Sequence, residues 1–211
     1  DGQHTVKVKA VDELGNESLY STALVFTVDT TPPAVPGIPQ TESPTNNQSP
    51  AWTWELSAGA VAYNVYLDGE ATPSAAVAQP YPGDEMLFVH PDTLAEGTHH
   101  LQVTALDALG NESVKSGTGH VVIDLTDPAV PKMAGLPAYT NADELMLVWT
   151  AVDSAVKYKV EYTIAGAATT EDNIDVQTLT INIADPTAVD GNVITAKVRA
   201  YDAVGNVSGW S

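Results

Sequence analysis

The chain has 211 residues and carries 8 Lys and Arg against 27 Asp and Glu, which gives a formal net charge of −19. This balance and the lack of any apolar run near about 18 residues exclude a basic nucleic-acid surface and membrane insertion. A hydrophobic content of 44% excludes a disordered acidic tail, and the absence of cysteine excludes disulfides and thiol catalysis.

Alternating apolar and polar residues predict β-strands along the whole chain. Trp52, Trp54 and Leu56 share one strand face, which points to the core, and the strand before Asp68 and Gly69 ends in a hairpin signal. The expected strands, in chain order, are 6–10, 24–28, 51–56, 61–67, 101–105, 120–123, 145–149 and 156–162. Because no stretch has helical periodicity, the sequence predicts an all-β fold of antiparallel sheets.

An internal repeat divides these strands into units. The segment Asp-x-x-Gly-Asn-x-Ser occurs at 12–18, 107–113 and 202–208, so that each copy follows the previous one by 95 residues. Trp54 and Trp149 obey the same step. Periodicity of this length is typical of tandem arrays.

The repeat register predicts three parts and a longer parent array. Residues 1–30 correspond to the C-terminal two strands of a truncated repeat plus a linker. Residues 31–125 form a complete β-sandwich repeat, and 126–211 form a repeat that lacks its last strand. We therefore expect the chain to be an excerpt from a longer series of sandwiches joined end to end.

These residues resemble the fibronectin type III and bacterial immunoglobulin-like tandem repeats of large extracellular adhesins and surface proteins. The resemblance is carried by the second-strand Trp54 and Trp149, the segment 63–69, the segment 1–12 with its turn 15–18, and the linker 28–33. The tyrosine-corner position of that fold falls at His4, His99 and Ile194, so the corner must be held by packing or by another bond.

The resemblance also suggests calcium between repeats. The Asp-x-x-Gly-Asn-x-Ser turn would lie at the pole where the preceding unit and its linker arrive, together with the loop of Asp153. Several carboxylates without Lys or Arg suit a hard cation with oxygen ligands. The expected ligands are Asp29, Asp107 and Asn111 at the first junction, and Asp124, Asp127, Asp202 and Asn206 at the second.

A purely local explanation of the same segment competes with calcium. The Asp side chain can accept hydrogen bonds from backbone N–H groups of its own turn. Gly and Asn accept positive φ, and the Ser hydroxyl can bond back to the loop. Each copy also contains an Asn-x-Ser glycosylation signal, which the turn alone explains. The five histidines give no chelating arrangement, because adjacent His99 and His100 face opposite sides of a strand.

The sequence contains no nucleophile elbow, phosphate-binding loop or zinc-protease motif, so we expect no enzyme. The resemblance implies a structural extension or stalk module, extracellular or on a prokaryotic cell surface, which spaces a distal binding domain from the cell. Its expected partners are neighbouring repeats of the same polypeptide, and self-assembly into fibres is left open.

Two alternatives come from other functional classes. A carbohydrate-binding or accessory module of a polysaccharide-degrading protein would need exposed aromatic platforms, for which Trp210 and Tyr81 are the candidates. A fibre subunit assembling by strand exchange would use strand 24–28 of one copy to complete the last repeat of another.

Overall fold

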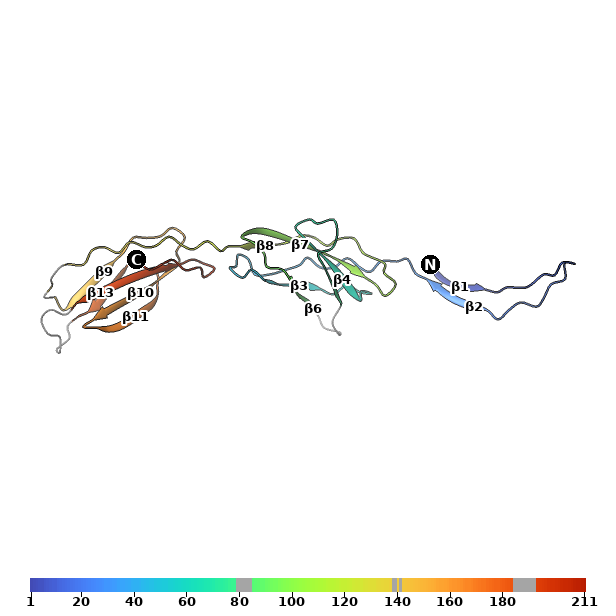
Figure 1. The fold of residues 1–211 in the computed structure, drawn as a ribbon, viewed down its shortest axis with the longest axis horizontal. Coiled ribbons are helices and arrows are strands. Elements are labelled where there is room, and N and C mark those ends of the chain that lie inside the picture. Colours follow the sequence, from blue (N-terminus) through green and yellow to red (C-terminus); the bar gives the residue numbers. More distant parts are fainter. Residues whose placement is uncertain (79–84, 138–139, 141, 184–192) are drawn as a thin grey trace. The chain divides into compact units, whose positions relative to one another are not determined.

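The computed structural model describes residues 1–78, 85–137, 140, 142–183 and 193–211, so Tyr81 lies outside the described residues. In this part every regular element is a β-strand (Figure 1), which confirms the predicted all-β class. The described residues contain no helix that is long and apolar enough to span a membrane.

The chain divides into two compact units. The first comprises residues 1–43 and 49–122, and the second comprises 44–48 and 123–211. The three-part division at residues 30 and 125 follows the repeat register and stays a prediction.

The complete repeat is built from two sheets with a buried core. In one sheet β3 (Ala51–Glu55) pairs with β6 (Glu85–Val89), and the other has the order β5 (Ala75–Ala78), β4 (Ala62–Leu67), β7 (Gly97–Leu106), β8 (Gly119–Ile123). Trp52 and Trp54 alternate with partly or fully exposed neighbours on β3 and are almost fully buried, as predicted. Trp54 packs edge-on against Tyr63 of β4, with ring centroids 5.6 Å apart.

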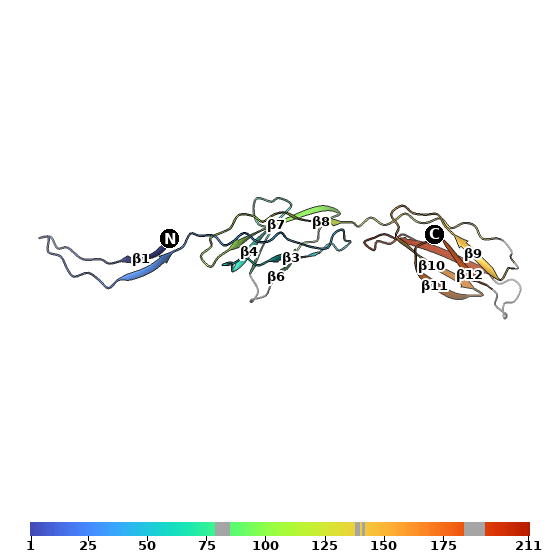
Figure 2. The same cartoon turned by 180° about the vertical axis from the view of Figure 1, so that it is seen from behind.

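The last repeat has the corresponding arrangement. Strand β9 (Glu144–Val148) pairs with β12 (Thr178–Asn182), and the second sheet has the order β11 (Ala167–Ile174), β10 (Lys157–Ile164), β13 (Ile194–Tyr201). Figure 2 shows these strands from behind. Trp149 and Tyr158 take the places of Trp54 and Tyr63, because their rings meet edge-on at 5.6 Å. Alternate residues of β10 and β13, among them Val160 and Val198, are fully buried.

The first 30 residues form the hairpin β1 (Gly2–Val6) and β2 (Leu24–Val28), which are paired along their whole length. Val8 is 64% exposed, whereas its equivalent Val103 is completely buried. The hairpin therefore carries core-type side chains without a facing sheet. Because β2 pairs with β1 of its own chain here, assembly by strand exchange stays a prediction.

Two tight turns shape the sheets. Asp68 and Gly69 both have positive φ, +48° and +78°, as the hairpin signal at the end of β4 predicts. In the last repeat the chain turns two residues later than the 95-residue step implies. Ala165 and Gly166 take the positive-φ positions there and join β10 to β11.

Candidate functional site: the repeated turn

The most repeated polar feature is a closed turn built around an aspartate. In the complete repeat the Oδ1 atom of Asp107 accepts hydrogen bonds from the backbone N–H groups of Leu109 (2.8 Å) and Asn111 (2.9 Å). Its Oδ2 atom accepts the side-chain amide of Asn111 at 2.7 Å. Gly110 has φ +88°, which a side chain would disfavour. The local explanation is therefore confirmed for the aspartate and the glycine. It is wrong for the asparagine, because Asn111 does not take the positive φ that was expected of it.

The other two copies repeat this geometry. Asp12 accepts the side-chain amide of Asn16 at 2.9 Å, and Asp202 accepts that of Asn206 at the same distance. Hydrogen bonds from the Asn111 side chain and then from backbone amides outweigh burial and lower the pKa of Asp107. The same bonds from Asn16 lower the pKa of Asp12. Both carboxylates are thus held in the charged, hydrogen-bonding form.

The asparagine of the turn also bonds to the segment that precedes its own repeat. The Nδ2 atom of Asn111 donates to the backbone carbonyl of Asp29 at 3.1 Å. The Nδ2 atom of Asn206 donates to the carbonyl of Asp124 at 3.0 Å and more weakly to that of Thr126 at 3.4 Å. The side-chain amide of the asparagine therefore links the aspartate of the turn to the segment that precedes the repeat.

The structure brings together only part of each predicted calcium site. Asp107 and Asn111 meet the backbone of Asp29, whereas the Asp29 carboxylate accepts the N–H of Thr31 at 3.0 Å. Among the described residues no three carboxylate or imidazole side chains gather closely enough to hold a metal ion.

The second predicted site has the same arrangement. Asp202 and Asn206 are both buried, and the Asn206 side chain donates to the Asp124 backbone. The Asp124 carboxylate accepts the N–H of Thr126 at 3.0 Å, and Asp127 is exposed. Calcium at the two junctions stays a prediction.

A pair of serines follows each turn and completes the neighbouring strand. Ser113 Oγ accepts the N–H of Ala105 at 2.9 Å, and Ser116 Oγ accepts that of Val103 at 3.1 Å. Each serine also donates its own N–H to the carbonyl of the same strand residue. Buried backbone groups of β7 are satisfied in this way. Sequence reasoning expected only a bond within the loop, although Ser-x-x-Ser recurs with the 95-residue step.

At the tyrosine-corner position, His99 supplies the bond that a tyrosine would make. Its Nε2 atom lies 2.9 Å from the carbonyl of Ala95, four residues upstream, and its Nδ1 atom lies 2.8 Å from the Asp68 carboxylate. Both partners are acceptors, so the ring must carry two protons to satisfy them. Burial opposes the charge, but the bonds to Asp68 and Ala95 prevail and raise the pKa of His99.

In the other two repeats, different contacts hold the corner. His4 stacks on Phe26, with ring centroids 5.6 Å apart, and Ile194 packs against the core of the last repeat. Sequence reasoning identified these positions and left open whether packing or another bond holds each corner. The structure shows packing in two cases and a bond in the third.

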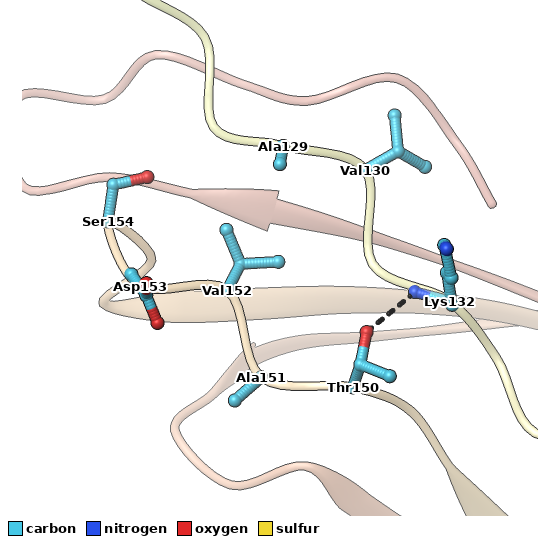
Figure 3. A pocket seen from close by; sticks show the side chains of 8 residues that line it. All are labelled: Ala129, Val130, Lys132, Thr150, Ala151, Val152, Asp153 and Ser154. Carbon is cyan, nitrogen blue, oxygen red and sulfur yellow. Dashed lines mark hydrogen bonds between the residues drawn. The ribbon is translucent and has the colours of Figure 1, made fainter.

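An open hollow of about 410 Å³ lies beside the linker of the last repeat (Figure 3). Half of its eight lining residues are alanine or valine, and the N–H of Lys132 donates to Thr150 Oγ1 at 3.0 Å. Asp153, which was expected at this pole, lies at the opposite end of the hollow from Lys132. Asp153 and Lys132, the two charged side chains that line the hollow, therefore do not form an acid–base pair.

No protein-family model matches the sequence, and no curated protein matches it. Solved structures similar to the chain include the FN1–FN3 domains of chicken CNTN1, at 17% sequence identity and a TM-score of 0.46. The similarity covers 99% of this chain and 73% of that one. It carries no functional argument, and the all-β class rests on the strands and their pairing.

Proposed function

We propose that this chain is a non-catalytic extension module of a large extracellular repeat protein, an adhesin or a surface fibre. It would space a distal binding domain from a prokaryotic cell. The observation that supports this most is the bond from each turn to the preceding segment, through Asn111 in one case and Asn206 in the next. A contact that recurs once per repeat restrains the chain at each junction, which a spacer needs.

The linkers add to this restraint. Prolines at 32–33 and 128 fix φ and favour extended backbone. The carboxylates of Asp29 and Asp124 cap the same segments. A net hydrogen bond contributes about 1 kcal/mol, so each bond favours the fastened junction about fivefold.

A distance measurement between spin labels tests the proposal at the first junction. Because the chain has no cysteine, Lys7→Cys and Glu70→Cys place two labels at unique exposed positions. We expect Asn111→Ala to broaden the distribution of label distances by electron–electron double resonance. Asn16→Ala is the matched control, because it removes the same bond within its own turn.

Equal widths in the Asn111→Ala and Asn16→Ala chains would contradict the proposal. The expected result is a distribution that widens only when Asn111 is replaced, with unchanged circular dichroism in both variants.

The carbohydrate-binding alternative rests on Trp210, and the contacts of that side chain do not favour it. Lys197 Nζ lies 4.4 Å and the Arg199 guanidinium 4.7 Å from its ring centroid. Because cations already lie over the ring, its stacking surface is engaged within the protein. The alternative stays a prediction that a glycan-array screen would test.

A further inference from the structure

Half of the basic residues of this acidic chain lie on one sheet face of the last repeat. Tyr158, Val160, Val198 and Ala200 of β10 and β13 point into the core, so their neighbours point outward. We call this outer surface the basic face, and its residues are Lys157, Lys159, Lys197, Arg199, Tyr201 and Trp210. It contains four of the eight Lys and Arg of a chain whose net charge is −19.

The cations of the basic face differ in how they are neutralised. Lys159 pairs with Asp172 at 3.2 Å, and Lys197 pairs with Glu161 at 2.7 Å. Arg199 makes no ion pair within the described part of the chain, and its buried Nε has no hydrogen-bond partner there. Its guanidinium is instead held over the ring of Trp210 and, at 5.2 Å, over that of Tyr201.

The other repeats show which group Arg199 lacks. At the equivalent position of the first repeat, Lys9 pairs with the carboxylate of Glu17. In the second repeat, Thr104 donates its hydroxyl to Glu112. The glutamate therefore belongs to the same small cluster in both repeats, one residue before the first serine of the Ser-x-x-Ser pair.

In the last repeat the glutamate is replaced while the strand keeps a cation. Val207 stands at the position of Glu17 and Glu112, and Arg199 stands at that of Lys9. A guanidinium normally takes a carboxylate through two parallel hydrogen bonds. Stacking on Trp210 fixes its plane in advance, which lowers the ordering cost of such a pair.

We propose that the basic face docks on a carboxylate-rich surface of a second copy of this chain, with Arg199 as its anchor. Charge complementarity supports this partner, because a second copy has 27 acidic residues and only four of its eight cations lie outside its own basic face. At physiological salt the screening length is about 8 Å, so the repulsion between the two net charges is damped while a direct pair persists.

This contact would join two different surfaces of the same molecule. A heterologous interface of that kind generates a ring when its rotation closes and an open filament when it does not. The inference goes beyond the proposed spacer function, because a stalk can space a domain without lateral association.

Sedimentation velocity of the full chain across a concentration series tests the proposal. The face variant is Lys157→Glu with Arg199→Glu, and the matched control is Lys7→Glu with Lys132→Glu, which changes the net charge equally elsewhere. We expect the natural chain and the control to associate at about 150 mM salt, with at least about tenfold weaker association at about 500 mM. The face variant should remain monomeric with an unchanged circular dichroism spectrum.

Three outcomes would overturn the proposal. A natural chain that stays monomeric at every concentration excludes the second copy as partner. Equal association of the face variant and the control excludes the basic face. A monomeric chain that binds polygalacturonate beads through Arg199 would assign the face to an acidic polysaccharide instead.

Discussion

Replacing His99 by isoleucine, the residue at this corner in the last repeat, should destabilise the complete repeat in a pH-dependent way. The charged ring bonds to two acceptors, the carboxylate of Asp68 and the carbonyl of Ala95. A neutral ring has one N–H and can satisfy only one of them. His99→Ile therefore removes two hydrogen bonds at low pH, where the ring is charged. It removes only one at high pH, where the ring is neutral.

The contacts set the size of the effect. A hydrogen bond to a charged group contributes about 1.5–3 kcal/mol, and an exposed ion pair about 1 kcal/mol or less. The His99 side chain is 15% exposed, but that of Asp68 is 43% exposed, so the pair between them belongs near the lower figure. We expect His99→Ile to cost about 2 kcal/mol near pH 5.5 and about 1 kcal/mol near pH 8.5.

The direction of the pH dependence follows from the two pKa shifts. The pKa of His99 is raised above 6.5, so its contribution is complete below 6.5 and is lost as pH rises through the folded-state pKa. Burial acts to raise the pKa of Asp68, but bonds from His99 and His100 lower it below 3.8. The Asp68 contribution is therefore present above 3.8 and is lost as pH falls through its folded-state pKa.

Urea unfolding followed by nuclear magnetic resonance measures this effect in the full chain. The amide signal of Val103 reports the unfolding of the complete repeat alone. A signal from one repeat is needed because the repeats of a multi-domain chain need not unfold at the same urea concentration. His120→Ile is the control, since His120 is exposed on β8 of the same repeat. An equal cost of His99→Ile at both pH values, or an imidazole pKa below 6.5, would refute the reasoning.

Gly119→Ala should cost about 3 kcal/mol or more in urea unfolding, because the added Cβ would lie 2.2 Å from the carbonyl oxygen of Pro39; a loss below about 1 kcal/mol would contradict this packing. Ser113→Ala should cost about 1–3 kcal/mol, since the buried N–H of Ala105 loses its acceptor, and amide exchange at Ala105 should accelerate. Ala165→Asn should raise stability by roughly 0.5–1 kcal/mol, because asparagine tolerates the φ of +50° better, and a loss would argue against that turn. The calcium prediction requires the melting temperature to fall by several degrees in chelator, and an unchanged melt contradicts it.

The repeat and the core could be predicted from the sequence because both depend on local patterns. Trp52 and Trp54 have the spacing of one strand face, and both are buried. Asp68 and Gly69 have the residue types of a tight turn, and both take positive φ. These features need no knowledge of which distant residue lies nearby.

The partners of the site depend on long-range geometry and were predicted less well. The partner of Asn111 is a backbone carbonyl 82 positions earlier, which no residue type announces. The sandwich topology predicted that Asp29 approaches Asp107 and Asn111. The Asp29 backbone carbonyl does accept a hydrogen bond from Asn111, whereas the Asp29 carboxylate accepts the N–H of Thr31. The sequence placed His99 at the tyrosine-corner position. It did not reveal the partner Asp68, because that residue lies in the turn after a different strand.

The use of a main-chain acceptor by Asn111 and Asn206 has an evolutionary consequence. Every residue offers a carbonyl, so the fastening does not depend on which side chain occupies the preceding position. A gene that duplicates, deletes or recombines its repeats would keep each new joint without a compensating substitution. A tandem array built from such repeats would therefore accept an added unit together with its own junction hydrogen bond.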